Sequence, residues 1–417
     1  MALFFYRQFP LLVFMGIWAL CIGLYSLGLF NIRPVSMQTW ILLYSGIAAV
    51  AGGYILMSVY LIDSRLDLFK KAEVNTPALV LNEKRLANLV LFLFFMSCTG
   101  AVICLTQIAG MVGGVEKYVS SPLEVRNTIT GIQQNPLVAP PLAYRLGNYM
   151  MSVGFVGSIL GGILITGTTW KKYMGLLPLV AALIPAILYF SRYVFVNSIT
   201  FWWLAFLFTS FFYRRERTKK LLIRLFVTSV AVLAFTLSFS YFIFSARNAM
   251  WGDFQDAFFE TLYVYFAGNI AAFDVFLFED TALYYGQQTF RTIITWLARL
   301  NIWNPGSVHS VHQPFVVISS TQAINTYTFV QTFYGDFGIT GTLFLSGLWG
   351  AGTRYAVYKY MQKFSFIRLG FVLVMSFSLI MSFYGFYLSN LTTIVFWLVV
   401  LYLSDYISGK DVLYSIQ

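Results

Sequence analysis

Long runs of apolar residues recur along the chain, separated by short polar connections. A helix needs about 20 apolar residues to cross a bilayer, and about ten runs approach that length. No stretch alternates between apolar and polar positions as a half-buried strand would. We therefore predict membrane-spanning helices at residues 9–30, 38–62, 86–108, 146–168, 173–190, 193–213, 221–244, 337–353, 366–388 and 391–403.

The composition supports this interpretation. Of the 417 residues, 59% are hydrophobic and only 10% are charged, and the mean hydropathy is +0.74. In soluble domains about a quarter of the residues are charged. In lipid every backbone polar group must be paired internally, which favours helices. The expected fold is an all-α polytopic membrane protein, with residues 1–417 as one integral membrane domain.

The placement of basic residues predicts the orientation of the helices. The chain has 27 Lys and Arg residues and a net charge of +11. Most of these residues lie in alternate connections, which the positive-inside rule assigns to the cytoplasm. We expect both termini in the cytoplasm and an even number of spans. Because the positive charge belongs to loops, no nucleic-acid partner is expected.

Two large connections lie on the predicted outer side, at residues 110–144 and 245–336. Within the second, the aromatic stretch 258–278 is expected to be an interfacial helix. Basic residues on this side are nearly all arginines, whose planar fork holds phosphate oxygens in pairs. Each could instead anchor a helix end at the membrane surface. The arginines expected to bind a diphosphate are Arg126, Arg192, Arg247 and Arg291.

Carboxylates and histidines in the outer connections are candidate bases. Transfer to a hydroxyl group gains from a base that accepts the proton. Asp336 lies beside glycines at the start of a predicted span, although it could equally cap that helix. His309 is the second candidate, because imidazole titrates near neutral pH. No third ligand accompanies His309 and His312, so no metal site is expected. Weaker candidates are Glu124, Asp274, Glu279 and Asp280.

Residues 325–341 contain a recognisable pattern. Asn325, Tyr327 and Thr328 are followed by Tyr334, Asp336, Phe337, Gly338 and Gly341. This pattern resembles the N-x-Y-T…Y-x-D-F-G-x-x-G signature of bacterial oligosaccharide repeat-unit polymerases, the Wzy-type O-antigen and capsule polymerases. Further segments resemble family elements in the same order: Glu124 to Arg126, Ser191-Arg192, Tyr265 to Gly268 with Phe273-Asp274, and Gly286 with Thr289-Phe290. The Arg-rich loop of the sister polymerase and ligase families is absent.

The resemblance implies a reaction and a set of partners. A growing glycan on undecaprenyl diphosphate would be transferred to the non-reducing-end hydroxyl of a new lipid-linked repeat unit. This reaction would occur on the periplasmic face of the bacterial inner membrane. The implied fold is a membrane glycosyltransferase of the C type, without a cofactor. The implied partners are undecaprenyl-diphosphate-linked oligosaccharides, membrane lipids and a Wzz-type chain-length regulator. Asp336, His309 and Tyr327 are the expected catalytic residues, and Asn325, Tyr334 and Glu124 the expected glycan contacts.

Three other functions remain open at this stage. An O-antigen ligase-like transferase would differ only in its acceptor. A lipid-glycan flippase or another transporter would place ionisable residues at mid-membrane and often show repeated halves. The predicted spans carry almost no charge and no repeat is visible. A structural partner in a polysaccharide assembly complex would not need so many outer arginines.

Overall fold

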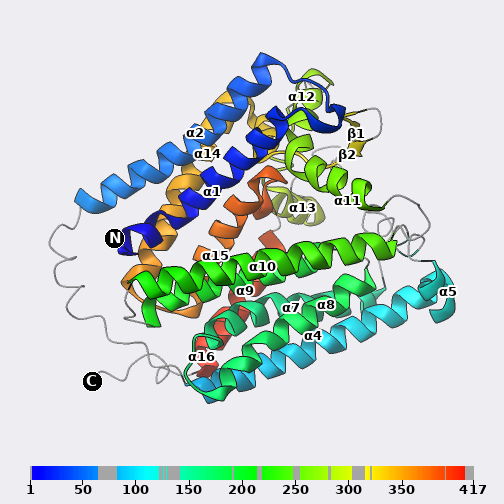
Figure 1. Cartoon of the computed structure of the whole chain (residues 1–417), viewed down its shortest axis with the longest axis vertical. Coiled ribbons are helices and arrows are strands. Elements are labelled where there is room, and N and C mark those ends of the chain that lie inside the picture. Colours follow the sequence, from blue (N-terminus) through cyan, green and yellow to red (C-terminus); the bar gives the residue numbers. More distant parts are fainter. Residues whose placement is uncertain are drawn as a thin grey trace. The chain divides into compact units, whose positions relative to one another are not determined.

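The structure, a computed structural model, is almost entirely helical over the residues that it describes (Figure 1). The described residues are 2–63, 82–121, 125, 128, 141–189, 192–213, 218–247, 254–279, 283–302, 315–319, 322–389 and 391–408. The chain forms two compact units, which are described separately. The first comprises Met1–Thr76, Gln255–Lys363 and Val374–Val395, and the second comprises Pro77–Phe254, Phe364–Leu373 and Phe396–Gln417.

Three long helices form the frame of the first unit: α1 (Ala2–Ser26), α2 (Met37–Asp63) and α14 (Phe329–Gln362). Helices α1 and α2 are antiparallel and are joined by a short connection that includes the 3₁₀-turn η1 (Leu29–Asn31). Helix α14 kinks at Gly338, whose φ of 66° and ψ of −160° leave the helical region. Beyond this kink α14 runs beside α2 in the same direction.

The stretch between α10 and α14 folds into short elements, and most of them belong to the first unit. They are α11 (Phe254–Tyr263), the π-helical turn η3 (Val264–Gly268), α12 (Asn269–Glu279) and α13 (Arg291–Arg299). A two-stranded antiparallel sheet, β1 (Val316–Val317) with β2 (Ala323–Ile324), precedes α14. The unit also contains the 3₁₀-turns η4 (Met381–Phe383) and η5 (Tyr387–Ser389).

Large aromatic side chains fill the core of the first unit. Phe329, at the start of α14, packs edge-on against Phe14 and Trp18 of α1 and against Trp349 further along α14. Phe273 of α12 belongs to the same buried cluster. The N-terminal part of α14 is therefore fixed on several sides by packing, which makes it a rigid base for the loops above it.

The second unit is a bundle of helices. Its members are α4 (Glu83–Val112), α5 (Val115–Ser120), α7 (Leu142–Leu164), the 3₁₀-helix η2 (Trp170–Leu176), α8 (Leu177–Leu188), α9 (Arg192–Tyr213), α10 (Thr218–Arg247) and α16 (Leu391–Ser408). Helix α15 (Phe366–Ile380) contributes residues to both units, as does α16, whose residues 391–395 belong to the first unit. Helices that follow one another along the chain pack antiparallel, as α4 with α7 and α9 with α10, whereas α7 and α9 are parallel.

Within the described residues, nine helical segments are long and apolar enough to cross a membrane. Eight of them confirm predicted spans, and the chain is a multi-pass membrane protein. The predicted interfacial helix at 258–278 is wrong in its environment, since Phe258–Phe278 is the ninth apolar segment and is largely buried. An interfacial helix would leave one face in solvent. The predicted span 337–353 lies inside α14, which is too polar to count among the nine, and 391–403 falls in the shorter apolar helix Thr393–Tyr406.

Candidate functional site

The candidate site lies in the first unit, around the N-terminal turns of α14. Thr328 caps this helix by accepting a hydrogen bond from the Gln331 amide. Two turns later Asp336 is completely buried. Its carboxylate oxygens accept hydrogen bonds from the amides of Gln288 (3.1 Å) and Thr289 (2.5 Å). Asp336 therefore binds the loop at 284–289 to α14.

Backbone contacts extend the attachment of this loop. The Tyr284 amide donates to the Gly335 carbonyl at 2.8 Å, and the Tyr285 amide donates to the Asp336 carbonyl at 3.2 Å. Gly335 permits the close approach: a Cβ atom there would lie 3.0 Å from the Phe276 ring and 3.2 Å from the Tyr284 ring. The Y-x-D-F-G and G-x-x-T-F segments of the sequence are thus one packed unit.

The environment of Asp336 affects its protonation. Burial raises the pKa of this carboxyl above its ordinary value of 3.8, although the amides of Gln288 and Thr289 oppose the shift. A carboxyl group with a raised pKa can exchange a proton nearer to neutral pH. In this structure, however, the carboxyl group is completely buried, and each of its oxygens accepts one amide hydrogen bond. To serve as a base, Asp336 would first have to become accessible to the acceptor hydroxyl.

The segment before α14 packs against α12. The Thr326 hydroxyl donates to Asn269 Oδ1 at 2.6 Å, and the Asn269 side-chain Nδ2 donates to the Tyr265 carbonyl at 2.6 Å. Tyr327 is buried, with its ring edge-on to Phe276 at 6.4 Å. Tyr334 and Asn325 are only half-buried. Four of the sequence-predicted residues, Asp336, Tyr327, Tyr334 and Asn325, thus lie along one segment of the first unit.

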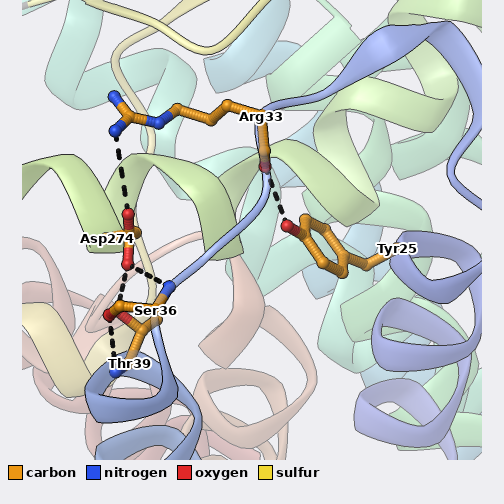
Figure 2. A network of polar contacts seen from close by, with 5 residues as sticks. All are labelled: Tyr25, Arg33, Ser36, Thr39 and Asp274. Carbon is orange, nitrogen blue, oxygen red and sulfur yellow. Dashed lines mark hydrogen bonds and ion pairs between the residues drawn. The ribbon is translucent and has the colours of Figure 1, made fainter.

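Figure 2 shows a second carboxylate, Asp274 of α12, holding the connection between α1 and α2. Its Oδ1 accepts hydrogen bonds from the Ser36 amide (2.8 Å) and the Thr39 hydroxyl (2.6 Å). Its Oδ2 lies 3.9 Å from Arg33 Nη2. The Arg33 side chain is 45% exposed, whereas that of Asp274 is 4% exposed. A buried anion therefore orients a cation that reaches the surface.

The same network connects Arg33 to two other parts of the unit. The Tyr25 hydroxyl donates to the Arg33 carbonyl at 2.8 Å (Figure 2), and the Arg33 amide donates to the Ile318 carbonyl at 2.9 Å. Tyr25 in turn packs edge-on against Trp40, which lines an open groove between α1 and α2. The groove is mostly apolar, and its walls are Ser26, Met37, Trp40, Ile41, Tyr44 and Ser45.

Of the four arginines predicted to bind a diphosphate, Arg291 is the one that belongs to the first unit. It begins α13, two residues after Thr289, whose amide is bonded to Asp336. Burial lowers the pKa of Arg291 to about 10, so that the guanidinium is still charged at neutral pH. The neighbouring Thr292 hydroxyl donates to the Ser389 carbonyl at 2.9 Å, which fixes the start of α13.

The other predicted residues belong to the second unit or lie outside the described residues. Arg192 is half-buried at the start of α9 in the second unit. Arg247 ends α10, but its side chain lies outside the described residues, as do Arg126, Glu124 and His309 entirely. Among the described residues, no three His, Cys, Asp or Glu side chains could hold a metal ion together.

Sequence reasoning did not select Arg33 as a site residue. Arg33 and Asp274 are 241 residues apart, and neither belongs to a spacing that points to the other. The available signals were an arginine in a very short outer connection and an acid in an otherwise apolar helix. A buried acid needs a partner. The sequence could therefore have predicted a cation beside Asp274, but not which residue supplies it.

No family model, no curated protein and no solved structure matches this chain.

Proposed function

We propose that this protein is a polymerase of lipid-linked oligosaccharide repeat units, with its active site in the first unit. It would transfer a growing glycan from undecaprenyl diphosphate to the terminal hydroxyl of a new lipid-linked unit. The observation that carries the proposal is the packing of the resembling motif segments upon one another. Asp336 binds the 284–289 loop, Thr326 binds Asn269, and Asn269 binds Tyr265.

The proposed chemistry follows from the charges of the site. In the transfer, the acceptor oxygen forms a bond to the anomeric carbon while the bond from that carbon to the diphosphate oxygen breaks. Negative charge grows on the departing diphosphate, so pre-oriented cations beside it lower the barrier. Arg33 and Arg291 are the arginines of the first unit on the predicted outer side whose side chains the structure describes. We assign the diphosphate to these two cations.

The remaining assignments concern the lipid chain and the proton. The apolar groove near Trp40 is suited to the isoprenoid chain of the donor or acceptor, because it lies between two membrane helices and is connected to Arg33 through Tyr25. The proton of the acceptor hydroxyl goes to a base. Asp336 and His309 stay the two predictions for that role, and Tyr327, Tyr334 and Asn325 stay predicted contacts of the glycan.

The directions of the helices support an outer location for this site. Helix α14 runs in the same direction as α2. Suppose that α4, α7, α8, α9 and α10 each cross the membrane once. The chain then leaves α10 on the side where α2 begins. Because α14 runs in the same direction as α2, it must begin on that side too, so the stretch between α10 and α14 makes an even number of crossings. The segment Phe258–Phe278 would then enter and leave on one side. The positive-inside rule makes that side periplasmic, as proposed for an inner-membrane protein.

A glycan ladder tests the proposed function. The protein is expressed with its repeat-unit pathway, and extracted lipid-linked glycans are separated on a gel at matched protein levels. We expect a ladder for wild type and only a single exported repeat unit for Arg33→Ala and Arg291→Ala. Arg145→Ala is the matched control, because Arg145 is an exposed outer arginine of the second unit. Full ladders from both site variants would refute the site, and export without lengthening in wild type would favour a transporter.

A further inference from the structure

Arg354 is a buried cation whose charge is not balanced by any described anion. It lies in α14 beyond the kink and is 3% exposed. Its Nε donates to the Ser58 hydroxyl of α2 at 2.8 Å. Its Nη1 is buried without a hydrogen-bond partner. Among the described residues, no carboxylate forms an ion pair with Arg354.

Such an arrangement is costly without a ligand. A guanidinium has five N–H donors, and here the Ser58 hydroxyl accepts one bond. The Ser58 hydroxyl itself donates to the Tyr54 carbonyl at 2.9 Å, which leaves its oxygen free to accept from Arg354. A buried charge is normally paired or hydrogen-bonded, because transferring it from water is strongly unfavourable. An anion that satisfies Nη1 would remove this deficit.

A second cation adds to the positive potential. Arg7 of α1 acts electrostatically on Arg354, and the two charges repel. The Arg7 carbonyl accepts a hydrogen bond from the buried Tyr54 hydroxyl, which places α1 beside this part of α2. Arg7 is half-buried, and its charge adds to the positive potential around the buried Arg354.

The helices leave Arg354 little freedom to move away. Gly53 packs against the Gly347 carbonyl and Gly350 against the Val50 carbonyl, so that any Cβ atom at Gly53 or Gly350 would clash with backbone. Arg354 follows one turn after Gly350, and Ser58 follows five residues after Gly53. Both therefore lie on a rigid pair of backbones near the ends of α2 and α14.

The position along the helices agrees with a membrane-surface ligand. Arg354 lies eight residues before Gln362, or about 12 Å from the end of α14, and about 24 Å beyond the kink at Gly338. Arg7 lies near the start of α1. These cations are thus near the opposite end of the bundle from Asp336, within the reach of long side chains to lipid headgroups.

We propose that Arg354, with Arg7, Ser58 and Tyr54, forms a binding site for a phosphate group at the end of α2 and α14 remote from Asp336. The ligand is a phosphate anion, either free or as the headgroup of an anionic lipid. Guanidinium groups bind two phosphate oxygens at once, which suits a donor set with an unused Nη1. The proposal does not depend on the polymerase function.

The test uses the purified full-length chain, freed of lipid in a neutral detergent. Thermal unfolding and native mass spectrometry are recorded with phosphatidylglycerol, phosphatidylcholine and inorganic phosphate in separate titrations. We expect stabilisation by phosphatidylglycerol or by inorganic phosphate, and none by the zwitterionic lipid at the same concentration. Phosphatidylglycerol alone would identify a lipid headgroup as the ligand, whereas an equal effect of inorganic phosphate would identify the free anion.

Variants connect the binding to Arg354. Arg354→Gln should weaken binding of the effective probe tenfold or more, as expected when a charge-assisted hydrogen bond is lost. Ser58→Ala keeps the cation and should weaken binding less, and it supplies the test if Arg354→Gln does not fold. Lys363→Gln, at an exposed cation just after α14, should bind like wild type. Absence of anion-dependent stabilisation in wild type, or equal binding by Arg354→Gln, would show that Arg354 is a structural cation only.

Discussion

Replacing Asp274 by Asn separates the two tasks of its carboxylate. Oδ1 holds the α1–α2 connection through Ser36 and Thr39, whereas Oδ2 forms an ion pair with Arg33 (Figure 2). An asparagine can keep its carbonyl oxygen at the Oδ1 position. Its NH₂ group would then face Arg33 and release the guanidinium toward solvent. Asp274→Ala removes both oxygens.

The two substitutions should therefore differ in their effect on the unfolding free energy. A hydrogen bond to a charged group contributes about 1.5–3 kcal/mol, and a neutral one about 1 kcal/mol. Because the Arg33 side chain is 45% exposed, its pair with Asp274 contributes at most about 1 kcal/mol. Asp274→Asn should lower the unfolding free energy by about 1–2 kcal/mol. Asp274→Ala, which leaves the buried Thr39 hydroxyl without Asp274, should lower it by about 3 kcal/mol or more.

Unfolding in a denaturing detergent, followed by tryptophan fluorescence, measures these changes, since Trp18 and Trp349 lie in the core of the same unit. Glu116→Gln, at an exposed acid, is the control and should stay within about 0.5 kcal/mol of wild type. Equal destabilisation by Asn and Ala at position 274 would show that the Oδ1 contacts do not fix the connection. Under the proposed function, Asp274→Asn should also reduce transfer, because Arg33 loses its orientation.

Three further predictions concern the α14 region. Burial raises the pKa of Asp336, so the folded state binds a proton there more tightly than the unfolded state. The stability of the wild-type protein therefore falls as pH rises from 3.8 through the folded pKa. Asp336→Asn should lose this pH-dependent component, as unfolding titrations would show. It should also lower the unfolding free energy by about 1–3 kcal/mol at pH 7, because its NH₂ group would face one of the two backbone amide donors. Loss of transfer with an intact fold would support Asp336 as the base. Gly335→Val should displace the 284–289 loop and cost about 1–3 kcal/mol in the same assay, while Gly16→Ala, with open space around it, should cost nothing. Arg291→Lys should lose transfer activity above about pH 8, because a lysine buried to the same degree has a lower pKa than arginine and loses its charge there. An unchanged pH–rate profile would contradict the proposal that Arg291 binds the diphosphate.

The sequence predicted the long helices because their signal is local. Twenty apolar residues in a row need no knowledge of the rest of the chain, and eight of the nine described spanning segments follow from it. The stretch 258–278 was misassigned because its aromatic and apolar residues suit either a membrane surface or a buried core. The burial of Ile270 and Phe273 decides between these environments, and it depends on packing against residues of α1 and α2.

The site was predictable only in part, for a similar reason. The motif at 325–341 named Asp336, but its partners Gln288 and Thr289 are nearly 50 residues earlier in the chain. That contact changes the interpretation of Asp336 from an exposed acid to a buried acceptor of backbone amides. Arg192 and Arg291 were both predicted to bind a diphosphate, yet they belong to different units. Their sequence contexts do not show this division.

The purified protein in lipid vesicles allows glycan polymerisation to be measured without other enzymes. Lipid-linked repeat units are supplied as the only substrates, and the products are analysed by mass spectrometry. If the protein is a polymerase, lipid-linked glycans of two or more repeat units should form, with one undecaprenyl diphosphate released for each new linkage. Arg291→Ala should give no product. Repeat units that cross the bilayer without being lengthened, or that stay unchanged while the protein is folded, would contradict it.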